Sequence, residues 1–249
     1  MSNPVAIFGD VHGNATGLRT LIDRVRTQSG PSTNLYSVGD LVDRGPDVRG
    51  VLDICVGEKV RGILGNHELW VKEVLSGGPM TDFPYSNIMG GLDTLKSYGL
   101  SRGDPDHVAP ALRRAVPKEH QEWLLGLPPY RFIKVAGLRY CLLHTGISVT
   151  LQDALLSKVP NVSEDGVINV LSEHAVDAFF WSGPKPTKPE TVARFKSFVQ
   201  VFGHTPTVEV VIVPGHYIAL DTGSGTCAPW ALSAVVLYPD GGHEVIRIG

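Results

Sequence analysis

Apolar and polar positions alternate in a regular order through the first third of the chain. Three apolar runs, Val5–Phe8, Asn34–Val38 and Val60–Leu64, are predicted strands. Between them, apolar residues recur at helical spacing from about Asn14 to Thr27 and from Val48 to Cys55. Strand and helix therefore alternate, which predicts a βαβαβ unit with a parallel sheet.

The middle of the chain has a different pattern. Residues 67 to about 130 predict a helix through Leu75, a loop rich in glycine and proline, and then short helices. We interpret about 76–130 as a helical insertion beside the functional site. Arg131–Val135 and Leu138–His144 flank a turn and predict a hairpin, and residues 150–196 predict helices and a long loop.

Strand-like segments dominate the rest of the chain. Clusters of proline, glycine and aspartate separate five of them: Phe198–Phe202, Val208–Val213, Tyr217–Leu220, Leu232–Tyr238 and Glu244–Ile248. The predicted fold class is α/β, a two-sheet α/β/β/α sandwich in which mixed sheets lie face to face with helices outside. We expect residues 1–249 to form a single domain with the insertion, because strand ends from the whole chain share one site.

Composition narrows the class of protein. Of the 249 residues, 43% are apolar, which is enough for a sizeable core, and the net charge of −3 gives no basic surface for stable nucleic-acid binding. No apolar run approaches the roughly 20 residues of a membrane span, and the chain enters a strand without a signal peptide. We therefore expect a soluble, cytoplasmic protein. Cys55, Cys141 and Cys227 are predicted to be reduced thiols.

The turn Gly39–Gly45 places two carboxylates and a guanidinium at the end of a predicted strand. Asp40, Asp43 and Arg44 lie between two glycines, and Pro46 follows. Glycine permits the sharp change of direction that holds polar side chains at the mouth of a sheet. This composition is typical of a functional site.

Four other predicted strands also end in residues that can bind a metal. Ligands gather beyond the carboxyl ends of strands in α/β sheets, so these ends can converge on one crevice. A single Asp-x-His turn or strand-end histidine is more often a surface turn or a cap, and the recurrence at five strand ends carries the prediction. The residues are Asp10 and His12, Asp40, Asn66 with His67, His144, and His204.

These side chains are sufficient for two ions. Carboxylates, one amide oxygen and imidazoles suit Mn²⁺, with Fe or Zn²⁺ as alternatives. Two cations about 3.5–4 Å apart need a bridging anion, and Asp40 is central in the set. We predict that one ion is held by Asp10, His12 and Asp40, and the other by Asp40, Asn66, His144 and His204.

Three further residues have predicted catalytic roles. His67 follows Asn66 directly, so it should point away from the ion that Asn66 holds and act as a general acid. Asp43 could keep its ring protonated. Arg44, which is planar and always charged, could bind phosphate oxygens in two-point fashion.

The remaining histidines and tryptophans have less informative contexts. Trp70, Trp123 and Trp230 are predicted to pack in the core or as caps. The histidines outside the candidate site lie in polar or turn segments, and we predict that they are solvated: His107, His120, His174, His216 and His243.

At these motifs the chain resembles the calcineurin-like metallophosphoesterases, and among them the phosphoprotein phosphatase group. The patterns GDxHG, GDxVDRG, GNHE, a strand-end histidine and GHT match residues 9–13, 39–45, 65–68, 144 and 203–205. The segments 116–128 and 221–223 look most like bacterial and phage serine/threonine protein phosphatases. The resemblance implies the ligand set given above, His67 as the acid partnered by Asp43, and Arg44 as the phosphate clamp.

The resemblance implies a dinuclear phosphoesterase that hydrolyses phosphomonoesters by attack of metal-bound hydroxide. We expect a protein serine/threonine phosphatase of broad specificity, with a phosphorylated protein or a small phosphoester as its substrate. The alternative enzyme is a dinucleoside polyphosphate hydrolase or phosphodiesterase, although such hydrolases typically carry Asp where Glu68 stands. A metal-binding regulatory protein is the alternative without turnover, but such a protein needs no acid like His67.

The chain departs from the resembled pattern after Trp181. Bacterial members usually carry a second phosphate-binding arginine soon after this tryptophan, whereas Ser182-Gly183-Pro184 follows it here. The second clamp is therefore missing or replaced. The candidates for a replacement are Arg113, Arg114, Lys185 and Arg194.

Overall fold

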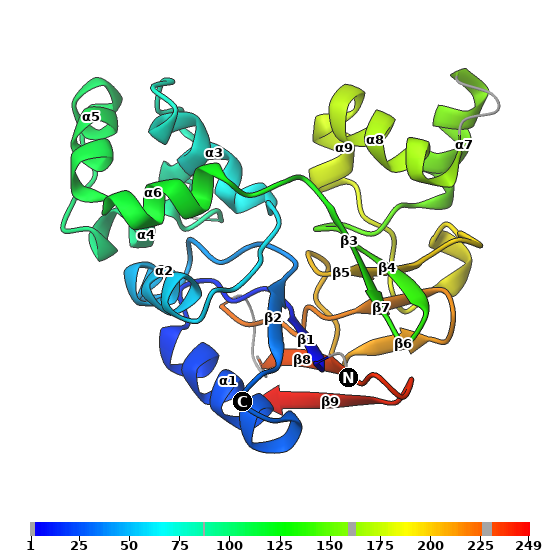
Figure 1. Cartoon of the computed structure of the whole chain (residues 1–249). Helices are drawn as coiled ribbons and strands as arrows, with labels where there is room; N and C mark the ends of the chain where they lie inside the picture. The colour runs from blue at the N-terminus through cyan, green and yellow to red at the C-terminus, as the bar shows by residue number, and fades with distance from the viewer. Residues whose placement is uncertain (1–2, 87, 159–162, 226–230) are drawn as a thin grey trace.

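The computed structural model describes residues 3–86, 88–158, 163–225 and 231–249. Its strands form two mixed sheets (Figure 1). The first sheet has the order β2-β1-β8-β9, formed by β2 (Asn34–Ser37), β1 (Val5–Phe8), β8 (Leu232–Leu237) and β9 (His243–Ile248). The second has the order β3-β4-β5-β7-β6, formed by β3 (Arg131–Val135), β4 (Leu138–Leu142), β5 (Val199–Phe202), β7 (Tyr217–Ala219) and β6 (Val211–Val213).

Alternate residues of β1 show how the layers are built. Val5 and Ile7 join a buried cluster with residues of β4, β5 and β8, so this face of the strand meets the second sheet. Ala6 and Phe8 point the other way and pack with Leu18 and other residues of α1 (Ala15–Ser29) and α2 (Val48–Gly57). Because successive side chains of a strand alternate between faces, β1 is apolar throughout. The predicted sandwich of two sheets with helices outside is confirmed.

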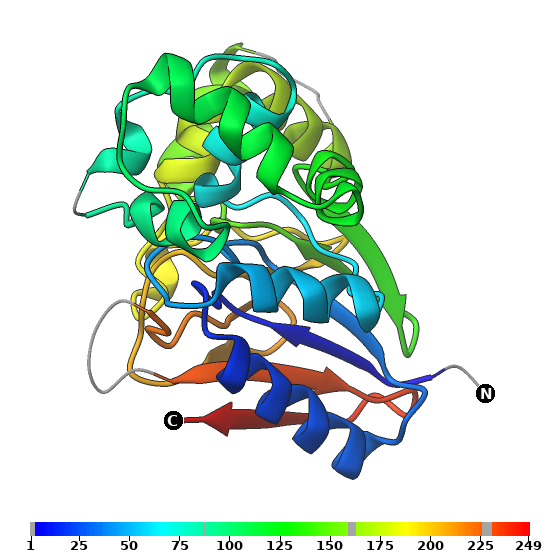
Figure 2. The same cartoon turned by 90° about the vertical axis from the view of Figure 1, so that its left-hand side faces the viewer.

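Two groups of helices extend beyond the sheets on the same side of the molecule (Figures 1 and 2). The first group contains α3 (Asn66–Leu75), the 3-10 turn η1 (Phe83–Tyr85), α4 (Gly91–Ser97), α5 (Pro105–Ala115) and α6 (Lys118–Leu125). The second group contains α7 (Val149–Lys158), α8 (Glu164–His174) and α9 (Val176–Trp181), and η2 (Pro189–Thr191) follows. Among the described residues, no helix is long and apolar enough to cross a membrane.

One predicted strand is wrong. Val60–Leu64 forms only an isolated bridge, in which Arg61 pairs with Tyr36. The reason lies in its hydrogen bonds, because the N–H of Leu64 donates to the carbonyl of Pro128 at 2.9 Å instead of continuing the ladder. The segment still leads directly to Asn66, which is the first residue of α3.

The prediction that His120 is solvated is also wrong. This histidine is 2% exposed and lies between Tyr98 and Asp53, whose oxygens are 2.9 Å from Nδ1 and 3.0 Å from Nε2. The polar context suggested a solvated residue, but both ring nitrogens are instead hydrogen-bonded inside the protein. Cys55 and Cys141 are buried free thiols, as predicted, whereas Cys227 lies outside the described residues.

Candidate metal centre

Several residues of the candidate site have backbone angles that non-glycine residues rarely adopt. The φ angles are 47° at His12, 52° at Asp40, 68° at Asp43, 63° at Arg44 and 68° at His204. Such conformations cost on the order of 1–3 kcal/mol each and persist only where the surroundings hold them. The turns that carry these side chains are therefore fixed by contacts elsewhere.

Glu68 holds the turn that contains Asp40. Its buried carboxylate accepts hydrogen bonds from the backbone N–H groups of Asp40, Leu41, Val42 and Gly65 at 2.8–3.1 Å. Glu68 is the third residue of α3, where a glutamate commonly bonds back to the helix start, and this capping pattern is the signal in the sequence that could have found it. The Glu68 side chain supports the loop from within the core and is not exposed to solvent.

One group of ligand atoms gathers at the ends of β2, β4 and β5. His144 Nε2 is 2.6 Å from Asn66 Oδ1, 3.1 Å from His204 Nδ1 and 3.3 Å from Asp40 Oδ2. His144 Nδ1 donates to the carbonyl of Val38 at 3.0 Å, which leaves the lone pair on Nε2 directed at the group. Two imidazole nitrogens, an amide oxygen and a carboxylate oxygen around one point fit a divalent cation.

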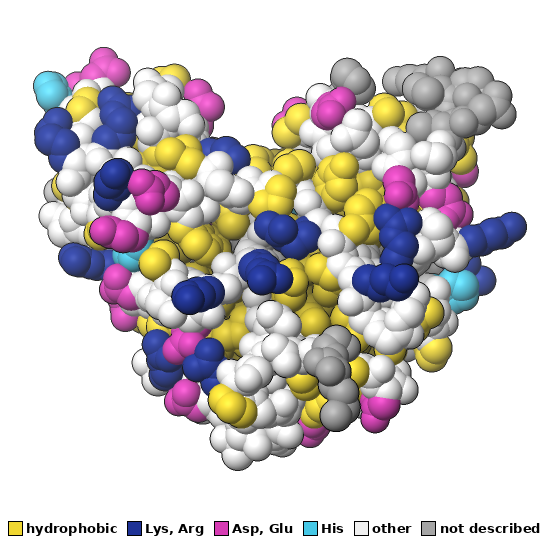
Figure 3. Space-filling model, viewed as in Figure 1, with side chains coloured by type: hydrophobic (Ala, Val, Ile, Leu, Met, Phe, Trp, Pro, Cys, Tyr) yellow, Lys and Arg dark blue, Asp and Glu magenta, His cyan; other side chains and the backbone are white. Residues whose placement is uncertain are grey.

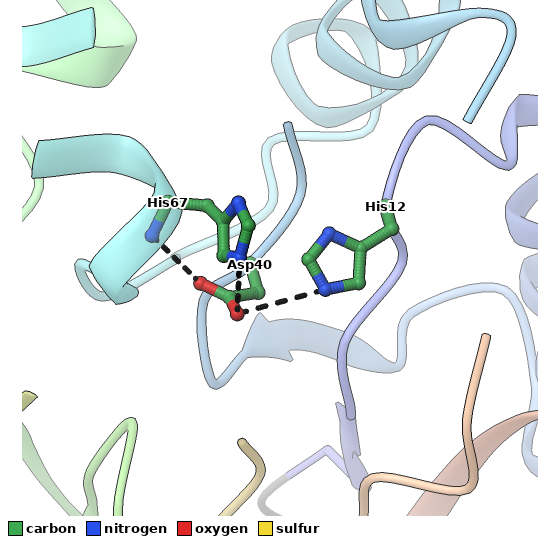
Figure 4. A group of neighbouring side chains, drawn as sticks. All are labelled: His12, Asp40 and His67. Atoms are coloured by element: carbon green, nitrogen blue, oxygen red, sulfur yellow. Dashed lines mark hydrogen bonds and ion pairs between the residues drawn. The ribbon is translucent and has the colours of Figure 1, made fainter. Parts of the chain in front are cut away.

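A second group contains His12, Asp40 and His67 (Figure 4). His12 Nε2 is 3.6 Å from Asp40 Oδ2, and His67 Nε2 is 4.0 Å from the same oxygen. His12 Nδ1 donates to the carbonyl of Val42 at 2.9 Å, so the lone pair again resides on Nε2. Asp40 is common to both groups, which is the position that the sequence analysis gave to the bridging carboxylate.

Asp10 is the predicted ligand that lies in neither group. Its buried carboxylate accepts from the backbone N–H of His204 at 3.1 and 3.3 Å. Burial, together with the neighbouring carboxylates of Asp221 and Asp40, raises the pKa of Asp10 well above its usual value. Burial likewise raises the pKa of Asp221 to about 6. A cation near these carboxylates would relieve their mutual repulsion.

Two imidazoles of the site are held in the form that binds metals. Burial lowers the pKa of His12 to about 3 and that of His204 to about 4. Neutral imidazole is the ligand form of histidine, so both rings are available at neutral pH. Burial also opposes charge on His144, but the carboxylate of Asp40 outweighs it and raises the pKa of His144.

His67 is fixed by a buried chain of hydrogen bonds. Its Nδ1 is 2.7 Å from Asp43 Oδ2, which also accepts from Trp70 Nε1–H at 3.0 Å. The other Asp43 oxygen accepts from the Thr94 hydroxyl at 2.6 Å. The sequence analysis paired His67 with Asp43 but missed both further donors, because Trp70 and Thr94 have no local pattern that links them to Asp43. The ring of His67 lies with His12 and Asp40, 4.0 Å from Asp40 Oδ2 through Nε2, and outside the group that contains Asn66.

Arg44 faces a cavity of about 550 Å³ that His204 also lines. Its Nη1–H donates to His12 Nε2 at 2.9 Å. Among the predicted replacements for a second clamp, Arg113 is tied to the first helix group, where Nη1 donates to the carbonyls of Val74 and Gly78 at 2.9 and 3.3 Å. Arg44 is the single cationic side chain among the described residues that line this cavity.

Trp70→Phe should lower kcat about 2–10-fold, because it removes one hydrogen bond from the Asp43 carboxylate while the packing is largely kept. If Trp70 acts through Asp43 and His67, the same change made in a His67→Asn background should have no further effect. Steady-state kinetics of the four proteins test this coupling. Additive losses would show that Trp70 acts by another route.

Comparison with known proteins identifies the family to which the chain belongs. A model of the calcineurin-like phosphoesterase family matches residues 3–216. A symmetrical bis(5'-nucleosyl)-tetraphosphatase of Paracidovorax citrulli is 30% identical over 142 residues, which are 56% of this chain and 43% of that protein. The chain thus matches less than half the length of this relative.

Two solved structures share the fold across nearly the whole chain. One, assigned as a diadenosine tetraphosphatase, is 20% identical with a TM-score of 0.56, and the match covers 99% of this chain and 94% of that one. The other is a protein serine/threonine phosphatase from Saccharomyces cerevisiae, 14% identical with a TM-score of 0.56, where the match covers 99% of this chain and 79% of that one. At these identities the likeness concerns the fold alone.

Proposed function

The chain belongs to the calcineurin-like phosphoesterase family, and we propose that it is a metal-dependent phosphoric ester hydrolase that cleaves phosphomonoesters at a dinuclear centre. The observation that carries the proposal is the convergence of two ligand groups on Asp40, beside the His67–Asp43 pair and the cavity of Arg44. Asp40, Asn66, His144 and His204 would hold one ion, with Asp10, His12 and Asp40 for the other. Mn²⁺ as the resident metal and a cytoplasmic location belong to the same proposal.

The protein residues have separate tasks in this scheme. The bound ions would polarise the phosphoryl group and acidify a water molecule. His67, oriented by Asp43, donates a proton to the leaving oxygen. Arg44 binds the non-bridging oxygens. His12 Nε2 has one lone pair, so it can accept from Arg44 or ligate an ion but not both. Arg44 must therefore release His12 in the working site, and its guanidinium is then free for phosphate.

A protein serine/threonine phosphatase is the leading specific function. The face seen in Figure 3 is hollowed between the two helix groups. Residues of α3, η1 and α9, including Asn66, Phe83 and Trp181, line one cavity there, of about 370 Å³. An open approach of this kind suits a phosphorylated loop of another protein. We also propose that the helices within 76–130 are an insertion in a single domain.

A dinucleoside polyphosphate hydrolase is the second candidate. The named relative in Paracidovorax citrulli supports it. Glu68 distinguished the two in the sequence analysis, but this residue is buried beneath the turn of Asp40. An aspartate there would alter the loop and would not contact a substrate, so Glu68 favours the phosphatase less than its identity suggests.

A substrate panel with and without Mn²⁺ tests the proposal. It compares a phosphopeptide, an aryl monoester, the matched aryl diester and diadenosine tetraphosphate. Metal-dependent hydrolysis with the highest kcat/KM on the phosphopeptide supports the phosphatase, and the highest value on the tetraphosphate supports the second candidate. If the metal-loaded protein hydrolyses none of them, the proposed function is wrong and a regulatory role is the better interpretation.

Arg44→Ala should lower kcat/KM for monoesters by roughly 10–150-fold, because it removes charge-assisted hydrogen bonds to the phosphate. Metal content should not fall, since the change also frees His12 Nε2 from a competing donor. Kinetics and metal analysis of the variant check both expectations. Arg49→Ala, which alters an exposed arginine at the start of α2, is the matched control. Equal losses in the two variants would remove Arg44 from the phosphate site.

Gly183→Arg should raise the preference for aryl monoesters over diesters by about tenfold or more, because a dianionic group gains more from a second guanidinium. Gly183 does not have a left-handed backbone conformation, but the added Cβ would lie 3.3 Å from Thr145 Cβ and 3.4 Å from Thr205 Oγ1, so Thr145 must shift slightly to admit it. The ratio of kcat/KM for the two esters is the measurement. An unchanged ratio would mean that another residue already fills this role.

A further inference from the structure

A second polar cavity adjoins the candidate metal centre. It has a volume of about 580 Å³ and lies between the start of α7 and the loop that follows α9. Two lysines, Lys185 and Lys188, line it together with the hydroxyl residues Ser148 and Thr150 and a single carboxylate, that of Glu190. The proposed mechanism uses none of these groups.

Gly183 lies close to both this cavity and the candidate metal centre. It lines the cavity, and a Cβ added to it would lie 3.8 Å from His204 Cδ2. His204 in turn lines the cavity of Arg44 and belongs to a ligand group. A residue without a side chain thus lies close to both spaces, at the position where the resembled pattern leads one to expect an arginine near Trp181. An extended substrate could cross here.

The loop that carries the two lysines is held in place. The Thr191 hydroxyl accepts from the N–H of Lys185 at 3.1 Å and lies 2.8 Å from the carbonyl of Lys188. The Tyr217 hydroxyl donates to the carbonyl of Pro186 at 2.7 Å. Because the backbone is already ordered, a ligand that binds here has to order only the lysine side chains.

The two ammonium groups are available for an anion. Within the residues that the structure describes, neither Lys185 nor Lys188 forms an ion pair, although Glu190 lines the same cavity. Two lysines against one glutamate leave an excess of positive charge. Lysine binds phosphate as a point charge and needs no fixed geometry, which suits flexible side chains at a cavity mouth.

We propose that this lysine cavity binds a second phosphate group of the same substrate molecule while the first lies at the metal centre. The proposal rests on the proposed phosphoesterase function and refines its substrate class to compounds that carry more than one phosphate. In this proposal Lys185, one of the predicted replacements for the missing arginine, contacts the second phosphate and not the phosphate that is cleaved. Arg44 then remains the clamp on the phosphate that is cleaved.

A series of alkanediol phosphates tests the proposal. Each linear α,ω-diol is supplied as its monophosphate and as its bisphosphate, over increasing chain lengths, with Mn²⁺ in excess. At the chain length that spans Gly183, kcat/KM of the wild-type protein should be higher by about tenfold or more for the bisphosphate than for the monophosphate. This is the effect expected of one hydrogen bond to a charged group. Shorter chains should show no preference beyond the statistical one of a substrate with two equivalent phosphates, because the second phosphate does not reach the lysines.

Lys185→Gln combined with Lys188→Gln should bring the ratio of kcat/KM for bisphosphate and monophosphate to about two at every length, the statistical value for a substrate with two equivalent phosphates. Because both substrates are measured on one preparation, a general loss of activity cancels in this ratio. Lys134→Gln, which changes an exposed lysine of β3, should keep the wild-type ratio.

Two results would overturn the inference: a wild-type protein that hydrolyses the monophosphates but shows no bisphosphate preference beyond the statistical one at any length, or a larger preference that survives in the double variant. Failure of the metal-loaded wild type to hydrolyse any monophosphate would instead contradict the proposed function. The two failures are therefore distinguishable.

Discussion

Chelation of divalent ions should reduce monoester hydrolysis by at least about 10²-fold, because without them no group of the site can acidify water toward neutral pKa. Mn²⁺ should restore activity best. The ligand atoms are carboxylate and amide oxygens with imidazole nitrogens, a mixed set that Mn²⁺ accepts while it keeps exchangeable positions for water. Full activity in a preparation verified to be free of metal would contradict the proposal.

Metal analysis of two variants makes this prediction sharper. Asp40 belongs to both ligand groups, whereas His204 belongs to one. Asp40→Asn should therefore lower the metal content from about two ions per chain to near none, and His204→Asn by about one, as expected for a two-metal site with a shared carboxylate. Equal losses in both variants would mean that the two groups do not bind separate ions.

The sequence predicted the fold where a strand is buried on both faces, or where buried and exposed residues alternate strictly along it. The βαβ start is an example, since the apolar run Val5–Phe8 belongs to a strand that is covered on both faces. Val60–Leu64 is also predicted as a strand from its apolar residues, but the N–H of Leu64 donates to the carbonyl of Pro128. An apolar run indicates that a segment is buried. The hydrogen-bond partner of this segment, however, lies some sixty residues away along the chain, and no local pattern contains that information.

The same limit applies to the site. Asp40, Asn66, His144 and His204 come together because each follows a strand or buried segment that ends at the same edge, a placement that sequence order can predict. Glu68, Trp70 and Thr94 instead act through contacts with the Asp40–Asp43 turn. These residues lie on α3 and α4, and apart from the capping bond of Glu68 to Gly65, their contacts with the turn depend on packing between elements that no local pattern contains.

His67→Asn should lower kcat by roughly 10²–10⁴-fold, the usual contribution of general acid catalysis, while the metal content stays the same. Asparagine cannot supply the proton that an imidazolium held by Asp43 supplies. The control is His107→Asn, which changes an exposed histidine of α5 and should leave kcat unaltered. A matching loss in the control would show that the effect is not specific to His67.

The position of His67 allows a second role, and the leaving group of the substrate separates the two. Its Nε2 lies in the ligand group of His12 and Asp40, so it could bind an ion instead of donating a proton. A general acid matters most when the leaving oxygen is strongly basic. If His67 is the acid, the defect of His67→Asn should be large for an alkyl phosphate and should nearly vanish for an aryl phosphate with an acidic phenol. If His67 is a ligand, the defect should be the same for both substrates and metal should be lost, because the ion serves every substrate alike. Parallel kinetics on the two phosphates, with metal analysis of the same samples, decide between a proton donor and a ligand.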